Sequence, residues 1–334
     1  MPALEHLELF DVVWLKDTAS VPSPLGYKTA SSLGKISFPR LRYLSLWIPH
    51  PDYTFLLSKI EFPSSTATIA LHPQLHDIPE EDEETIRQVL FPAVLSHFQT
   101  MAAHNTGRLR ALSCLGGGEN YFEVGLFIDT PAAETFADKS AIPHIHLYID
   151  VGGSALKWIR IVRQLLQVLP IADVDTLCVG AIASYIRDEH KKHTFLVELT
   201  GIFALLPDVT TLCLVSVYGA KDLQDFSVLL CPSPNLDAGP IDKSPSLPHL
   251  TTLLIEHFDC DPWQRSTHGF DPTVAKLIQI LGERALSRYM CKRVILHCCG
   301  GFPEADAKSM KKGLSDWDWE LKLDRRYPCS SCKS

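Results

Sequence analysis

The sequence lacks any long uninterrupted hydrophobic run. A membrane-spanning helix needs about 18 or more consecutive apolar residues, and the most apolar stretch, residues 159–174, is broken by Arg160, Arg163 and Pro170. The first ten residues carry two acidic side chains and no Lys or Arg, unlike a secretory signal peptide. We therefore expect no membrane partner and a location in the cytoplasm or the nucleus.

Concentrated positive charge is also lacking. The formal net charge is −8, and the longest runs of Lys and Arg are pairs, such as those at residues 191–192, 311–312 and 325–326. Binding to a phosphate backbone needs a cluster of such side chains, so we expect no nucleic-acid partner. The hydrophobic share of 46% and the charged share of 21% are typical of a folded chain rather than a disordered one.

The ten cysteines form no recognisable disulfide or metal framework. Cys178 and Cys213 lie in strand-like runs, where a thiol behaves as a small apolar residue. Cys329 and Cys332, with the His-Cys-Cys segment at 297–299 upstream, have side chains that zinc accepts. A second spaced cysteine pair is missing, so we favour a frayed tail or an adventitious disulfide and keep zinc as the alternative.

Catalytic signatures are absent as well. The sequence has no Gly-x-Ser-x-Gly and no His-Glu-x-x-His motif. The glycines at 116–118 are not followed by Gly-Lys-Ser/Thr, and we interpret them as a hairpin or tight turn before a strand that begins at Tyr121. His144 and His146 share one face of a predicted strand, but no third metal ligand lies nearby. The sequence predicts no enzyme activity, no catalytic residue, no cofactor and no metal.

What the sequence does contain is a recurring phrase, apolar-x-x-apolar-x-apolar, often preceded by proline. Its last two apolar residues are two positions apart and therefore point to one face of a short strand. The first lies in the turn that enters the strand, where proline fits because it cannot donate to a sheet. Clear copies lie at 4–9, 41–46, 174–179, 209–214 and 250–255, and weaker copies at 109–114 and 291–296.

Amphipathic segments with helical spacing separate these copies. They lie at residues 51–60, 81–103, 154–169, 194–206 and 272–286. Strands that alternate with helices over short connections indicate a parallel sheet covered by helices.

The first apolar positions recur at steps of 37 (4 to 41), 35 (174 to 209) and 41 (209 to 250 and 250 to 291). These exceed the roughly 20 to 29 residues of a usual leucine-rich repeat. The predicted fold is α/β, an irregular leucine-rich-repeat-like solenoid in which an arc of parallel strands is backed by helices. A doubly wound α/β domain is the alternative. We assign residues 1–320 to one elongated repeat domain with a soft division near 105–150, and 321–334 to a polar tail.

Three segments bring a family resemblance: the phrase at 1–9, the phrase at 38–46, and residues 56–66 followed by the strand-like 69–71. They resemble the repeat region of F-box proteins from mushroom-forming fungi. The resemblance implies the substrate-recruiting part of a cullin-type ubiquitin ligase, whose F-box would bind a Skp-family adaptor. The sequence departs from the pattern because its first repeat begins at Met1 without an F-box. A truncated gene model or a repeat-only relative would explain the difference.

The first functional hypothesis is a protein-binding repeat scaffold whose partner the sequence does not identify. The residues that directly follow the strand phrases are the expected contacts, because aromatic side chains there give a large contact area at low entropic cost. They are Trp47, Tyr218, His257 and Phe258. The alternatives are an α/β enzyme with an unrecognised site at the carboxyl ends of the strands, and a truncated, non-functional gene product.

Overall fold

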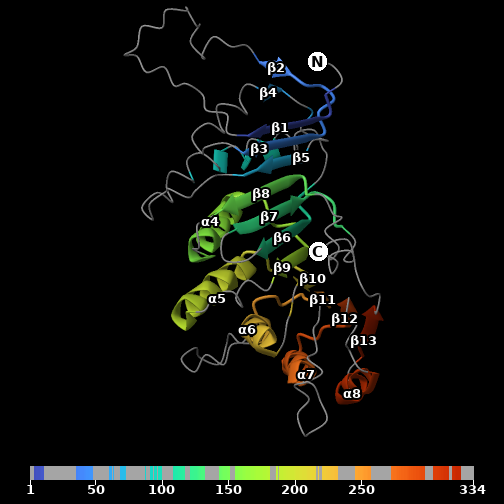
Figure 1. Cartoon of the computed structure of the whole chain (residues 1–334). Coiled ribbons are helices and arrows are strands. Elements are labelled where there is room, and N and C mark those ends of the chain that lie inside the picture. Colours follow the sequence, from blue (N-terminus) through green and yellow to red (C-terminus); the bar gives the residue numbers. More distant parts are fainter. Residues whose placement is uncertain are drawn as a thin grey trace, which may run out of the picture.

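An 11-stranded, mostly parallel sheet runs through the computed structural model (Figure 1). The structure describes residues 4–10, 35–47, 60–61, 63, 68–72, 87, 91–92, 94–95, 97–99, 108–116, 121–131, 143–150, 155–180, 186, 188–215, 217, 220–231, 245–256, 272–297, 304–315 and 318–324. The strand order is β1-β3-β5-β8-β7-β6-β9-β10-β11-β12-β13. Their bounds are His6–Phe10 for β1, Tyr43–Trp47 for β3, Thr68–Leu71 for β5, Ala111–Gly116 for β6, Tyr121–Phe127 for β7, Ile145–Asp150 for β8, Thr176–Gly180 for β9, Thr211–Val215 for β10, Thr252–Glu256 for β11, Arg293–His297 for β12 and Glu320–Asp324 for β13.

The sheet follows chain order except in its middle. Strands β6, β7 and β8 occupy it in reverse, with β8 beside β5 and β6 beside β9. Strand β7 is antiparallel to both of its neighbours, while all the other pairs are parallel. The parallel pairing is therefore interrupted by a meander, which lies at residues where the sequence analysis placed a soft division, near 105–150. A separate two-stranded parallel sheet joins β2 (Ile36–Ser37) to β4 (Ile60–Glu61).

All the labelled helices in Figure 1 lie along one side of the sheet. They are α4 (Ala155–Val168), α5 (Glu189–Ala204), α6 (Ala220–Leu230), α7 (Pro272–Leu286) and α8 (Glu304–Gly313). Within the predicted helix at 81–103, the described residues 87, 91–92, 94–95 and 97–99 are helical. The segment predicted at 51–60 lies outside the described residues except for Ile60, which is in β4.

Every copy of the phrase forms a strand, and the strand always begins two residues after the first apolar position. The same turn leads into β3, β9, β10 and β11: the amide of the first apolar residue donates to the carbonyl three residues earlier, at 3.1 to 3.4 Å. Proline occupies the second position of this turn at residues 39, 207 and 248, where its fixed φ suits a type I turn. Local turn chemistry therefore explains why proline precedes the phrase.

The residues at the start of neighbouring strands are also joined by backbone hydrogen bonds. The carbonyl of the residue before one strand accepts two successive amides of the following unit. These contacts are Arg42 and Tyr43 to Glu5, Thr210 and Thr211 to Asp175, Thr251 and Thr252 to Thr210, and Lys292 and Arg293 to Thr251. Adjacent strand entries thus share a repeated backbone contact, which extends the parallel pairing of the sheet; the leucine-rich-repeat solenoid stays a prediction.

Several elements differ from the sequence prediction. Helix α5 begins at Glu189 rather than at 194, because the Asp188 carboxylate accepts the amides of His190 and Lys191 and caps the helix there. Helices α6 and α8 were not predicted. Strand β13 occupies residues 320–324, so residues 321–324 of the predicted polar tail are in the sheet; residues 325–334 lie outside the described part.

Candidate functional site

The sheet has two chemically different faces. On each strand the alternating residues that point to the helices, such as Leu44 and Leu46 of β3, join one large apolar core. The opposite side, which we call the helix-free face, carries the other residues. On β9 to β12 it bears a small buried apolar cluster that includes Cys178, Cys213 and Leu254. On β1, β3, β5, β7 and β8 it carries aromatic and ionisable side chains instead.

Four rings on this face form a continuous line, the aromatic row, defined as Phe10, Trp47, His72 and Tyr148. Phe10 pairs in register with Trp47, and the pairings Leu46 with Leu71 and Leu71 with Leu147 place the following residues level with one another. The ring centroids of Phe10 and Trp47 are 5.6 Å apart, those of Trp47 and His72 are 3.7 Å apart, and those of His72 and Tyr148 are 5.2 Å apart. The row marks the carboxyl ends of β1, β3 and β5, because Phe10, Trp47 and His72 end or follow their strands, and it continues onto β8.

Trp47 is held in place from two sides. Its indole Nε1 donates to the Ser45 hydroxyl at 3.1 Å, and its ring stacks on the His72 imidazole with an interplanar angle of 10°. Ser45 and Ala70, both buried, are the small residues of this face next to it. The indole is thus held in one orientation by residues of the chain itself.

His72 is the most perturbed ionisable group of the row. Its side chain is buried, and its Nδ1 has no hydrogen-bond partner among the described residues. The pKa of the imidazole is lowered from 6.5 to about 4, mainly by burial and to a smaller extent by nearby His146, while Glu123 and Glu8 act in the opposite direction. His72 is therefore neutral at neutral pH and contributes to the row as an aromatic ring.

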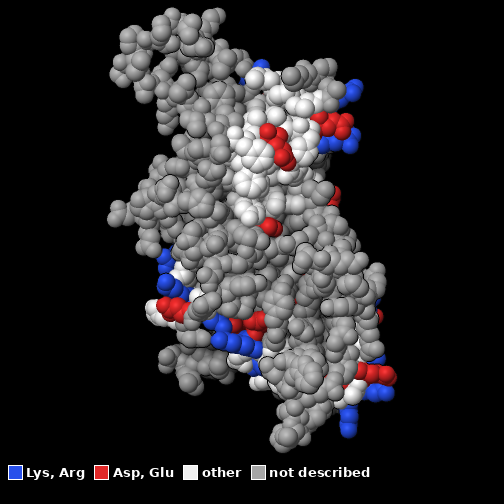
Figure 2. Space-filling view, in the orientation of Figure 1, with Lys and Arg blue, Asp and Glu red and all other residues white. Residues whose placement is uncertain are grey.

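Two carboxylates accompany the row. Glu8 lies beside His6, with 3.0 Å between its Oε1 and the imidazole Nε2, and Glu123 lies 3.7 Å from the Nε2 of His146. The described residues of the helix-free face on β1, β3, β5, β7 and β8 include no Lys or Arg. In Figure 2 the described surface over these N-terminal strands is mainly white, with red groups inside it and blue groups only at its margin.

The side chains described on the C-terminal half of the same face are mostly buried. A hydrogen bond with Cys178 raises the pKa of the Cys213 thiol on this face, and burial raises it as well. Such protonated thiols are poor nucleophiles. Glu256 and His297 also lie here, paired in register at the carboxyl ends of β11 and β12. Glu256 is completely buried and His297 is 7% exposed.

Only one of the four predicted contact residues lies in the described structure. Trp47 stands in the middle of the aromatic row, partly exposed. Tyr218, His257 and Phe258 lie outside the described residues, as do Cys329 and Cys332. His144 accepts a hydrogen bond from the Ile128 amide at its Nδ1, at 3.3 Å. It therefore lies apart from the row, whereas His146 lies beside Glu123.

Sequence reasoning missed Phe10, His72 and Tyr148, although a signal existed for the first of them. Phe10 directly follows the first copy of the phrase, just as Trp47 follows the second. The same offset that selected Trp47 would have selected Phe10. His72 and Tyr148 belong to strands that have no clear phrase.

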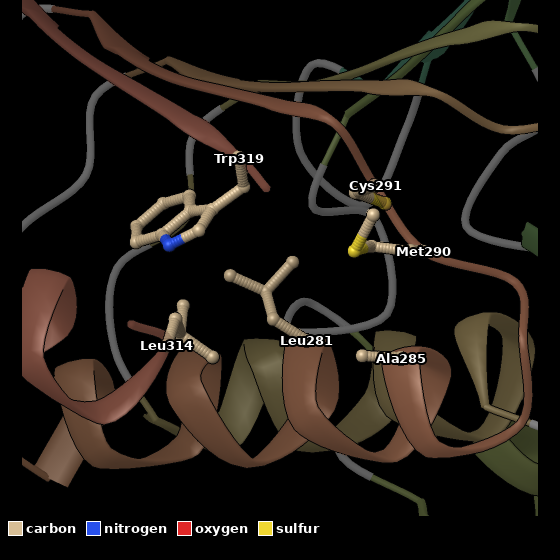
Figure 3. A pocket seen from close by; sticks show the side chains of 6 residues that line it. All are labelled: Leu281, Ala285, Met290, Cys291, Leu314 and Trp319. Carbon is tan, nitrogen blue, oxygen red and sulfur yellow. The ribbon is translucent and has the colours of Figure 1, made fainter. Parts of the chain in front are cut away.

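Described residues line two open hollows away from the aromatic row, one of about 380 Å³ beside Glu5, Arg40 and Pro63 and one of about 420 Å³ beside Lys311, Ser315 and Glu320. Figure 3 shows a pocket lined by Leu281, Ala285, Met290, Cys291, Leu314 and Trp319, between α7, the α8 end and the adjacent strands. Its lining is mostly apolar and it is barely large enough for one water molecule. No group of three His, Cys, Asp or Glu side chains within the described residues is arranged to hold a metal ion.

Comparison with protein-family models, with curated proteins and with solved structures finds no match to the chain. Among the helices that the structure describes, none has the length and apolarity to cross a membrane.

Proposed function

We propose that the chain is a protein-binding repeat scaffold that contacts its partner with the aromatic row of the helix-free face. The observation that carries this proposal is the row itself, four neighbouring rings with Phe10 at its outer end and 57% exposed. A large exposed aromatic side chain at the edge of a sheet lowers the solubility of a protein, and such side chains are enriched where proteins bind one another.

The geometry favours a surface that binds a partner over a pocket that encloses a small ligand. The row lies on a sheet surface between ordered strands and not in an enclosed chamber, and its tryptophan is already fixed by Ser45 and His72. Binding by rigid aromatic side chains loses little side-chain entropy.

The resemblance to fungal F-box repeat proteins supports a more specific version of this proposal. In that version the chain is the target-recognition part of an F-box-type ubiquitin ligase receptor, and the row contacts the target. A Skp-family adaptor would then join through an F-box on a segment beyond residues 1–334. The repeated strand entries agree with the stacked units that such receptors use.

The experiment is site-specific photo-crosslinking with the full chain in cells. The photo-crosslinker p-benzoyl-phenylalanine replaces Phe10 in one protein and Val197 in another. Val197 is a matched control because it is 53% exposed but lies on α5, on the helix-covered side. We expect a discrete adduct from position 10 that decreases when Trp47→Leu is added, and no such adduct from position 197. Equal adducts from both positions, or none from position 10, would refute the proposal.

A second candidate is an α/β enzyme whose site lies at the carboxyl ends of the strands, and one observation favours it. Glu256 and His297 are a buried acid and a buried imidazole on adjacent parallel strands, at the edge where α/β enzymes place their sites. A panel of ester, amide and phosphate ester substrates tests this idea. Turnover that is lost in both Glu256→Gln and His297→Gln, with unchanged thermal stability, would favour the enzyme, and no turnover on any of them would count against it.

A further inference from the structure

The charges around the aromatic row indicate what kind of partner it binds. We infer that the row accepts an extended, basic segment of a partner protein, with one Arg or Lys at Glu8 and a second at Glu123. This inference rests on the proposed function and specifies the chemistry of the partner.

Charge complementarity is the first argument. The two carboxylates stand at opposite ends of the row, Glu8 on the edge strand β1 and Glu123 on β7. Lys and Arg are missing from the described residues of this part of the face, and the whole chain carries a net charge of −8. A second copy of this chain or an acidic segment would meet like charge here, whereas a basic segment would meet opposite charge.

The second argument is the chemistry between the carboxylates. Arg and Lys carry long apolar stems, which pack on aromatic rings while the charged head reaches a carboxylate. Cations are also attracted to aromatic faces, most strongly to that of tryptophan. The carboxylates now face imidazoles, of which His6 is 59% exposed. A guanidinium can replace an imidazole with two parallel hydrogen bonds to the same carboxylate.

The third argument is spacing. Strands β1, β3, β5, β8 and β7 are consecutive neighbours in the sheet, so Glu8 and Glu123 lie four strand steps apart. At about 4.8 Å per step this separation is about 19 Å. An extended peptide that crosses the strands rises about 3.3 Å per residue, so two side chains about six positions apart reach both carboxylates. Positions six apart also lie on the same face of an extended segment.

The experiment measures fluorescence anisotropy of labelled 11-residue peptides with the full chain. The spaced peptide carries Arg at positions 3 and 9 with Leu at 5 and 7. The adjacent peptide has the same composition but places the two Arg side by side, and the acidic peptide has Glu in place of both Arg. We expect the spaced peptide to bind about threefold to fivefold more tightly than the adjacent one, and the acidic peptide not to bind.

Variants of the chain then locate the contact. Glu8→Gln is expected to weaken binding of the spaced peptide about threefold to fivefold, and Phe10→Ser is also expected to weaken it. The matched control Asp208→Asn removes the same charge from an exposed turn before β10, away from the row, and is expected to change affinity less than twofold.

Two results would overturn the inference. One is equal weakening by Glu8→Gln and Asp208→Asn, which would indicate non-specific attraction to a negative chain. The other is equal or tighter binding of the acidic or the adjacent peptide. If the position-10 adduct forms in cells while the peptides give either result, the aromatic row remains a protein-binding surface and only its charge preference is wrong. If that adduct is missing too, the proposed function fails with it.

Discussion

The indole of Trp47 lies almost parallel to the imidazole of His72, with their centroids 3.7 Å apart. This contact joins the end of β3 to the residue after β5 and covers the histidine. The stack therefore links the electrostatics of a buried group to a side chain that we propose touches the partner.

Removing the indole is predicted to change the titration of His72. In Trp47→Leu the imidazole regains water, so its pKa is expected to rise from about 4 towards the ordinary 6.5. The measurement is the pH titration of the histidine Cε1 proton by NMR. Phe10→Leu serves as the control, because Phe10 contacts Trp47 and its loss leaves His72 covered by the indole. An unchanged His72 titration in Trp47→Leu would mean that other residues exclude the water.

Acidification is predicted to destabilise the fold through two buried histidines. Burial lowers the pKa of His72 and of His97 to about 4 each, with a smaller lowering of His97 by His144. Because the folded-state pKa is depressed, the unfolded chain binds the proton first, and stability is lost as pH falls from about 6.5 towards 4. The loss is about 2 kcal/mol per histidine at pH 4.5.

Urea unfolding at pH 7 and at pH 4.5 measures this loss. The double variant His72→Gln with His97→Gln removes both titrating groups, and we expect a flatter dependence of unfolding free energy on pH. A variant with the same pH dependence as the original chain would assign acid sensitivity to other groups.

Arg284 of α7 is predicted to be a major stabilising residue. Its completely buried guanidinium donates to three backbone carbonyls, those of Tyr289 at 3.0 Å, Leu230 at 2.6 Å and Leu247 at 2.9 Å. It thereby ties the end of α6 and the turn before β11 to the end of α7. Arg284→Met leaves these carbonyls without the guanidinium and is expected to cost about 3 kcal/mol or more in urea unfolding.

The control for Arg284 is Lys276→Met on the same helix. Within the described residues, the hydrogen bond seen at the Lys276 ammonium group is the one to the Gln279 side chain, at 3.2 Å. Its loss is expected to cost less than about 1 kcal/mol. Similar costs for the two substitutions would contradict the role assigned to the guanidinium.

Arg288 is predicted to weaken the fold slightly. It follows α7 with a φ of 68°, while its amide donates to Ala285 and that of Tyr289 donates to Arg284, as in a Schellman motif. Glycine adopts this left-handed conformation without the penalty of a Cβ, so Arg288→Gly is expected to raise stability by about 0.5 to 1 kcal/mol. Arg288→Ala keeps the Cβ and should gain little; equal melting temperatures for the two variants would contradict this explanation.

Much of the fold could be predicted from the sequence because its causes are local. The turn that places Leu41 or Val209 beneath a strand is encoded within a few residues, so every copy of the phrase identified a strand. The antiparallel pairing of β6 with β7 has a local signal in the glycines at 116–118, whereas the return of β8 to β5 depends on pairing between distant segments and has none. Helix α8 (Glu304–Gly313) is rich in charged residues, which hides its apolar spacing.

The candidate site divides in the same way. Trp47 was predicted from its position after a phrase, and Phe10 follows the same rule. The contact of His72 with Tyr148 joins residues 76 positions apart (148 − 72), and it exists because β8 returns to lie beside β5. A single sequence gives no indication of that return.

The junction between β5 and β8 has a consequence for local opening. It is held by three registered residue pairs, fewer than join the other neighbours of the long sheet. Strands β1, β3 and β5 therefore form an N-terminal group that joins the rest of the described sheet through this short pairing alone. Their amides should exchange with deuterium sooner than those of β9 to β12. The aromatic row crosses the pairing of β5 with β8, with Trp47 on one side and Tyr148 on the other. A partner bound along the row would hold these two strands together, and its binding would slow deuterium exchange throughout the N-terminal strands β1, β3 and β5.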